Sequence, residues 1–84
     1  MDKKFELFQW TWSALIGNTA FFYFKQQGSY DLLMVEYWAD EDKVADYAQY
    51  CSEDGDIVED EGRYLTDDEK AYFLEVCRAA TAKK

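Results

Sequence analysis

Two runs of strand-forming residues flank one turn in AFFYFKQQGSYDLLMVEYW, residues 20–38. The first run, residues 20–25, has four consecutive aromatic residues, and the second, residues 30–38, is apolar on both of its faces. Aromatic and branched residues are favoured in strands, and residues 26–29 between the runs include turn formers. Because a connection this short joins only antiparallel neighbours, the stretch predicts an antiparallel hairpin.

The segment before this hairpin predicts a further strand. Between residues 8 and 16 the even positions are apolar, whereas Gln9, Thr11 and Ser13 are polar. This alternation has the period of a half-buried strand. The alternative is a helix that begins near Asp2 and presents one apolar face. We favour the strand, which makes the first half of the chain a three-stranded antiparallel meander.

The apolar period changes to that of a helix after Asp40. Asp40 is a candidate N-cap, and acidic residues directly after it suit the positive end of a helix dipole. We therefore expect a first helix here. Its apolar positions at helical spacing are Val44, Tyr47, Ala48 and Cys51.

A second helix is predicted to begin after Thr66. Thr66 and Glu69 have the spacing of a capping box, in which each side chain accepts a hydrogen bond from the other residue's backbone N–H. Arg78 stands toward the negative end of this helix, where a cation is favourable. The expected buried stripe of the helix consists of Phe73, Val76, Cys77 and Ala80.

The expected fold is therefore a small α+β domain, a three-stranded antiparallel meander followed by two helices. The chain has 84 residues, enough for a single domain that spans residues 1–84. Its hydrophobic content of 49% and aromatic content of 19% argue against a disordered acidic tail. A domain of this size has a thin core that cannot enclose a large cofactor, so no cofactor is expected.

The acidic residues are concentrated in one part of the chain. The sequence has 18 Asp and Glu against 9 Lys and Arg and no His, a formal net charge of −9. Between Glu36 and Glu69, fourteen acidic residues are opposed only by Lys43 and Arg63, whereas the rest of the chain is net positive. We expect a strongly polarised molecule.

The charge, the absence of targeting signals and the cysteines together disfavour several classes of partner and compartment. A net negative domain is repelled by nucleic-acid phosphates, so no direct nucleic-acid binding is expected. The sequence suggests no secretory signal and no membrane span. Cys51 and Cys77 stand alone rather than in a metal-binding or redox doublet, which favours reduced thiols packed in the core. We expect a cytoplasmic protein without a membrane partner.

The acidic stretch predicts a binding function. Carboxylates this dense repel one another, so they either confer solubility or serve to bind a partner. B-DNA presents one negative charge per about 1.7 Å of its axis, and acidic helix faces can approximate such a row. In size and charge the chain resembles the small acidic inhibitors that phages and mobile elements carry against restriction enzymes or CRISPR effectors. We expect a nucleic-acid mimic that blocks a basic, nucleic-acid-handling protein. The expected partner-binding residues are Asp40, Glu41, Asp42, Asp46, Glu53, Asp54, Asp56, Glu59, Asp60 and Glu61.

A calcium-binding loop is a weaker interpretation of the same residues. With Gly55 at the sixth position of an EF-hand loop, Ser52, Asp54 and Glu61 would stand at ligand positions. Tyr50, however, occupies the first position, where a carboxylate is needed. At most a weak cation site is expected.

The aromatic strands support an alternative function, and the sequence gives little support for catalysis. If helices cover one face of the sheet, aromatic residues on the other face are expected to serve an adaptor or a homodimer. Without His, an activated Cys or a phosphate-binding glycine loop, neither catalytic residues nor an enzyme activity is expected.

Overall fold

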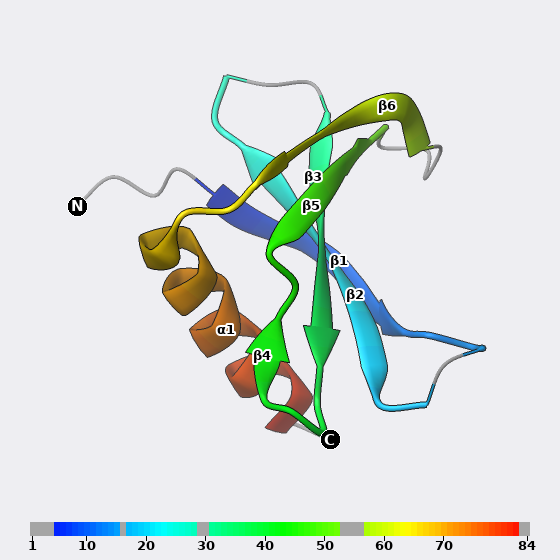
Figure 1. Cartoon of the computed structure of the whole chain (residues 1–84), viewed down its shortest axis with the longest axis vertical. Helices are drawn as coiled ribbons and strands as arrows, with labels where there is room; N and C mark the ends of the chain where they lie inside the picture. Colours follow the sequence, from blue (N-terminus) through cyan, green and yellow to red (C-terminus); the bar gives the residue numbers. More distant parts are fainter. Residues whose placement is uncertain (1–4, 16, 29–30, 53–56, 83–84) are drawn as a thin grey trace.

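The computed structural model describes residues 5–15, 17–28, 31–52 and 57–82, and only the backbone of residues 57–60 (Figure 1). These residues form an antiparallel sheet of six strands with one helix against it. The elements are β1 (Phe5–Trp12), β2 (Thr19–Gln26), β3 (Leu32–Trp38), β4 (Lys43–Val44), β5 (Tyr47–Cys51), β6 (Ile57–Tyr64) and α1 (Asp67–Ala82).

The predicted fold of a three-stranded meander followed by two helices is wrong, because the described residues form a six-stranded sheet and one helix. The antiparallel pairing of the first three strands is confirmed. β1 pairs with β2 and β2 with β3, both antiparallel, so that Phe22 has Trp10 and Val35 as its neighbours. β1 begins at Phe5 and ends at Trp12, whereas the alternation predicted a strand over residues 8–16. A β-bulge at Phe8 shifts its register. The alternative of an N-terminal helix is wrong in the described part of this segment.

The expected first helix is wrong. Residues 40–51 instead contain a turn and two strands, with Val44 paired to Tyr37 and Tyr50 paired to Leu33. Asp42 has a φ of 55°, a left-handed conformation that does not occur within a right-handed helix. Most of the apolar residues of this segment are buried, but they belong to β4 and β5 rather than to a helix. Their spacing along the sequence happens to match a helical period.

The loop expected between two helices contains β6. The strand order is β1-β2-β3-β5-β6, with β4 beside the end of β3. Gly62 of β6 pairs with Gln49 of β5, so residues that follow the meander extend the same sheet. An EF-hand needs a helix on each side of its loop, whereas β5 and β6 lie on either side here, which excludes that frame. Residues 53–56 lie outside the described residues.

The helix α1 covers one face of the sheet (Figure 1). The ring of Phe73 lies 4.4 Å from that of Phe24 and 4.9 Å from that of Phe5, measured between centroids. Phe73 and Cys77 are completely buried. Val76 and Ala80 of the predicted stripe pack against the same core and are partly buried.

The predicted capping box at the start of α1 is also confirmed. The backbone N of Thr66 donates to Glu69 Oε1 at 2.9 Å, and the backbone N of Glu69 donates to Thr66 Oγ1 at 3.1 Å. These two bonds satisfy N–H groups that have no partner within the helix, and a cap of this kind is worth about 1 kcal/mol. The helix therefore begins where the sequence predicts.

The face of the sheet opposite α1 has no helix on it in the described part of the chain. In the middle of β2 and β3 the residues of this face alternate with buried ones and are only half-buried, whereas Thr19 and Leu32 near its ends are buried. The residues of this open sheet face include Phe21, Tyr23, Met34, Glu36 and Trp38.

Gly62→Ala should destabilise the protein, because the pairing of β5 with β6 leaves no room for a side chain. An added Cβ would lie 2.6 Å from the carbonyl oxygen of Ala48 and 2.6 Å from the hydroxyl of Tyr47. We expect urea denaturation to show a loss of about 1–3 kcal/mol in unfolding free energy. Gly17→Ala is the control, since nothing lies within 4 Å of its added Cβ. Equal effects of the two substitutions would contradict the β5–β6 pairing.

Candidate functional site

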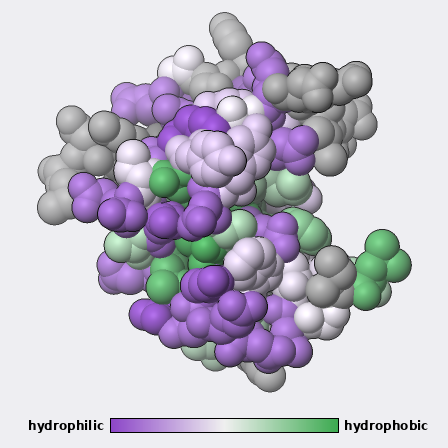
Figure 2. Space-filling model, viewed as in Figure 1, coloured by the Kyte–Doolittle hydropathy of each residue, from purple (hydrophilic) through white to green (hydrophobic). Residues whose placement is uncertain are grey.

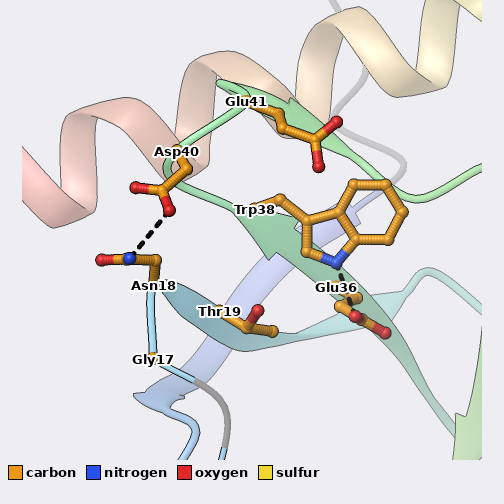
Figure 3. A pocket seen from close by; sticks show the side chains of 7 residues that line it. All are labelled: Gly17, Asn18, Thr19, Glu36, Trp38, Asp40 and Glu41. Carbon is orange, nitrogen blue, oxygen red and sulfur yellow. Dashed lines mark hydrogen bonds between the residues drawn. The ribbon is translucent and has the colours of Figure 1, made fainter.

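Figure 3 shows the side chains of Glu36 and Glu41 on either side of the Trp38 indole, and the Asp40 carboxylate pointing towards Asn18. Glu36 and Trp38 come from the open sheet face of β3, and Asp40 and Glu41 follow in the turn. They border an open pocket of about 270 Å³. This site, the Trp38 pocket, is lined by Gly17, Asn18, Thr19, Glu36, Trp38, Asp40 and Glu41.

Hydrogen bonds hold the side chains of the Trp38 pocket in place. Trp38 Nε1 donates to Glu36 Oε2 at 2.5 Å, and Asn18 Nδ2 donates to Asp40 Oδ2 at 2.8 Å (Figure 3). Asn18 has a φ of 68°, a left-handed conformation that asparagine tolerates well. The second bond joins the start of β2 to the end of β3, so the pocket is built across two strands.

A lysine of the chain already lies over the indole. Lys43 Nζ is 5.3 Å from the centroid of the Trp38 ring and 3.5 Å from Glu41 Oε1. An aromatic face beside a carboxylate is an arrangement that attracts ammonium and guanidinium groups. The Lys43 and Glu41 side chains are 55% and 62% exposed, so this ion pair is weak and open to competition. Chemically, the Trp38 pocket suits a lysine or arginine side chain of another molecule.

Two of the predicted binding residues, Asp42 and Asp46, are engaged with the helix. Arg78 Nε donates to Asp42 Oδ1 at 2.8 Å, and this hydrogen bond is the main reason why the pKa of Asp42 is lowered. Lys70 Nζ donates to Asp46 Oδ1 at 3.0 Å, which raises the pKa of Lys70. These carboxylates connect the β4 region to α1 rather than lining the Trp38 pocket.

The remaining predicted binding residues are not brought to the Trp38 pocket by any described contact. Glu61 is exposed and lies in β6, next to Gly62, which pairs with Gln49 of β5. Gln49 in turn pairs with Met34 of β3, four residues before Trp38, so β5 separates Glu61 from β3. The described acids of the stretch are thus spread over β3, the β3–β4 turn, the link between β4 and β5, β6 and the first turn of α1. Glu53, Asp54 and Asp56 lie outside the described residues, and of Glu59 and Asp60 only the backbone is described.

The ion pair with Glu69 engages Arg63, one of the two basic residues of the acidic stretch, at a partly buried position. Arg63 donates from Nη1 to Glu69 Oε1 and from Nη2 to Oε2, both at 2.8 Å. The hydrogen bond from Arg63 is the main reason why the pKa of Glu69 falls to about 2. Within the stretch only Lys43 then opposes the exposed carboxylates. Figure 2 shows hydrophilic side chains gathered over β4 and the turn before it.

Sequence reasoning predicted Asp40 and Glu41 but missed Glu36, Trp38 and Asn18. A signal for two of them was present, because the alternation in residues 30–38 places Glu36 and Trp38 on the side of Met34. Asn18 reaches the pocket because β2 pairs with β3 in one particular register. The sequence pattern does not specify that register.

The cysteines are buried, and the described residues offer no metal site. Cys51 and Cys77 are free thiols in the core, as predicted, although Cys51 belongs to a strand rather than a helix. Burial raises the pKa of Cys77 to about 12 and also raises that of Cys51, which disfavours the reactive thiolate. Among the described residues no group of three or more His, Cys, Asp or Glu could hold a metal ion.

No family model, curated protein or solved structure matches the chain. Within the residues described, there is no helix of the length and apolarity needed to cross a membrane. The functional interpretation therefore depends on the geometry, charge and exposure of the chain's own residues.

Glu69→Gln should make the folded state less sensitive to acid. The pKa of Glu69 is about 2 in the folded state against an ordinary 4.5, so ionised Glu69 contributes stability at neutral pH that is lost as pH falls from 4.5 towards 2. We expect the variant to lose about 1–3 kcal/mol of unfolding free energy at neutral pH and to show a shallower decline through this acidic range. The measurement is urea denaturation across pH.

Glu75→Gln is the matched control, an exposed residue on the same helix. It should leave both the stability and its pH profile close to those of the wild type. A Glu69→Gln profile parallel to that of the wild type would contradict the assigned role of the Arg63–Glu69 pair.

Proposed function

We propose that the protein acts by binding a basic protein partner and blocking the surface with which that partner handles nucleic acid. The Trp38 pocket is the observation that carries this proposal. Its indole face and the carboxylates of Glu36, Asp40 and Glu41 suit a lysine or arginine side chain. The position of Lys43 over the indole supports the same chemistry.

The excess of carboxylates supports a strongly basic partner. Even if each of the 9 basic residues neutralised one carboxylate, half of the 18 acidic residues would remain without a basic partner. The longest dimension of the fold is 33 Å, a length over which B-DNA carries about 19 negative charges. The net charge of −9 is therefore about half that of such a DNA segment. A field of this size accelerates encounter with a basic surface and disfavours acidic competitors.

The internal ion pairs distinguish carboxylates that stabilise the fold from carboxylates that are available to a partner. Asp42 and Glu69 each accept hydrogen bonds from an arginine, and their contacts hold α1 in place. Asp40 and Glu41 lie in the exposed β3–β4 turn, where their described contacts are with Asn18 and Lys43 and not with the helix. Binding rather than chemistry is further supported by the lack of His in the sequence and by the raised pKa values of both thiols.

A second candidate function is an adaptor that contacts its partner through the open sheet face. Phe21, Tyr23 and Met34 are only half-buried there, and no helix covers them in the described residues. A complex made through such apolar contacts would resist salt, whereas one made through carboxylates would weaken as salt rises.

Neutralising the turn should weaken capture of a basic partner. The double variant Asp40→Asn/Glu41→Gln is compared with Glu6→Gln/Glu75→Gln, which removes two exposed carboxylates elsewhere. Immobilised protein is incubated with cell lysate at about 50 mM and 500 mM NaCl, with and without added DNA, and retained proteins are identified by mass spectrometry. We expect the wild type and the control to retain basic nucleic-acid-binding proteins that high salt or DNA displaces. The turn variant should retain roughly two- to thirtyfold less, since each exposed ion pair is worth about 0.2–1 kcal/mol.

Equal retention by the two double variants would exclude the Trp38 pocket as the binding site. Partners that resist both salt and DNA, and that are lost on Phe21→Ser or Tyr23→Ser, would instead support the adaptor function.

A further inference from the structure

The two edges of the described sheet differ in charge. β1 forms one edge and β6 the other. β6 has the sequence IVEDEGRY with three acidic residues, whereas β1 has the sequence FELFQWTW with Glu6 as its single charge. An apolar edge strand offers unpaired backbone groups to another strand, and charged residues on an edge oppose such pairing. In the described residues, β1 is therefore the edge suited to pairing.

Large apolar side chains are exposed along β1. Phe8 is 46% exposed and Trp12 is 45% exposed. Phe5 and Leu7 of the same strand also border an open groove of about 440 Å³ that lies between β1 and α1. On the helix side of this groove Tyr72 is 38% exposed. A strand paired with β1 would bury these side chains together with the edge.

We propose that β1 pairs antiparallel with β1 of a second copy of the chain. The register that pairs all eight residues places Glu6 opposite Thr11 of the other copy and Leu7 opposite Trp10. The β-bulge at Phe8 makes this register possible. In a regular strand, residues 7 and 10 point to opposite faces, but the extra residue places both on the face covered by α1, beside Phe24 and Phe22.

The distribution of charge allows a second copy to pair with β1, although each copy has a net charge of −9. The acidic stretch begins at Glu36 in β3, and β2 separates β3 from β1. Joining two copies at β1 therefore keeps the most acidic strands at the outer ends of a continuous sheet, where their repulsion is smallest. A two-fold axis through this strand pair also makes the contact self-complementary and closed.

This inference goes beyond the proposed function and does not depend on it. The Trp38 pocket is lined by residues of the β1–β2 connection, the start of β2, β3 and the turn after β3, and by no residue of β1 itself. A dimer would therefore present two such pockets, and a partner with two basic sites would gain avidity from both.

Charge substitutions at the exposed residue Thr11 test both the dimer and its register. Thr11→Glu would place like charges opposite Glu6 twice in each dimer, whereas Thr11→Lys would place opposite charges there. Association of the purified chain is measured by analytical ultracentrifugation up to about 100 µM. We expect a species of twice 9.9 kDa for the wild type. Thr11→Glu should raise the dimer dissociation constant roughly two- to thirtyfold, and Thr11→Lys should lower it.

A wild-type chain that stays monomeric over this range would overturn the proposal. So would a dimer that responds equally to both substitutions at Thr11, because the two share the loss of the threonine and differ only in charge. A dimer that is lost on Tyr23→Ser and unaffected by Thr11→Glu would place the contact on the open sheet face instead.

Discussion

Phe73 of α1 packs against Phe5 of the first strand and Phe24 of the second, and thereby joins the two layers of the fold. A chain of 84 residues has material for only one such core, so the position of the helix is set by this contact. Fully burying an aromatic ring contributes about 1.5–3 kcal/mol, more than an exposed ion pair. The packing of Phe73 therefore determines where the charged residues of the helix lie, and the ion pairs do not determine the position of the helix.

The position of the helix determines which carboxylates remain available. With Phe73 in the core, α1 places Lys70 beside Asp46 and Arg78 beside Asp42. The helix thus brings cations to Asp42 and Asp46, whereas Asp40 accepts a hydrogen bond from Asn18 and Glu41 pairs with Lys43. Mutual repulsion among acids is tolerable because part of it is cancelled within the fold. The same arrangement leaves the molecule net negative.

The sequence predicted those elements whose signals are local. Alternating apolar residues and short connections sufficed for the meander, and the Thr66–Glu69 spacing sufficed for the start of α1. Residues 40–51 were mispredicted as a helix because pairing with β3, which lies earlier in the chain, outweighs local periodicity, and the left-handed Asp42 shows no clear sequence signal. For the site, the sequence supplied the acidic residues of the turn and, through the alternation of residues 30–38, a signal for Glu36 and Trp38. It did not supply Asn18, whose position depends on the register of β2 with β3.

The central claim, that the carboxylates around Trp38 receive basic side chains, is tested most directly by nuclear magnetic resonance with an arginine octapeptide as the basic probe. The account predicts shifts of the Trp38 indole N–H and of the Asp40 and Glu41 amides that saturate at low salt and disappear at high salt, because the contacts are largely electrostatic. Shifts confined to Phe21 and Tyr23, or an unchanged Trp38 indole, would contradict it.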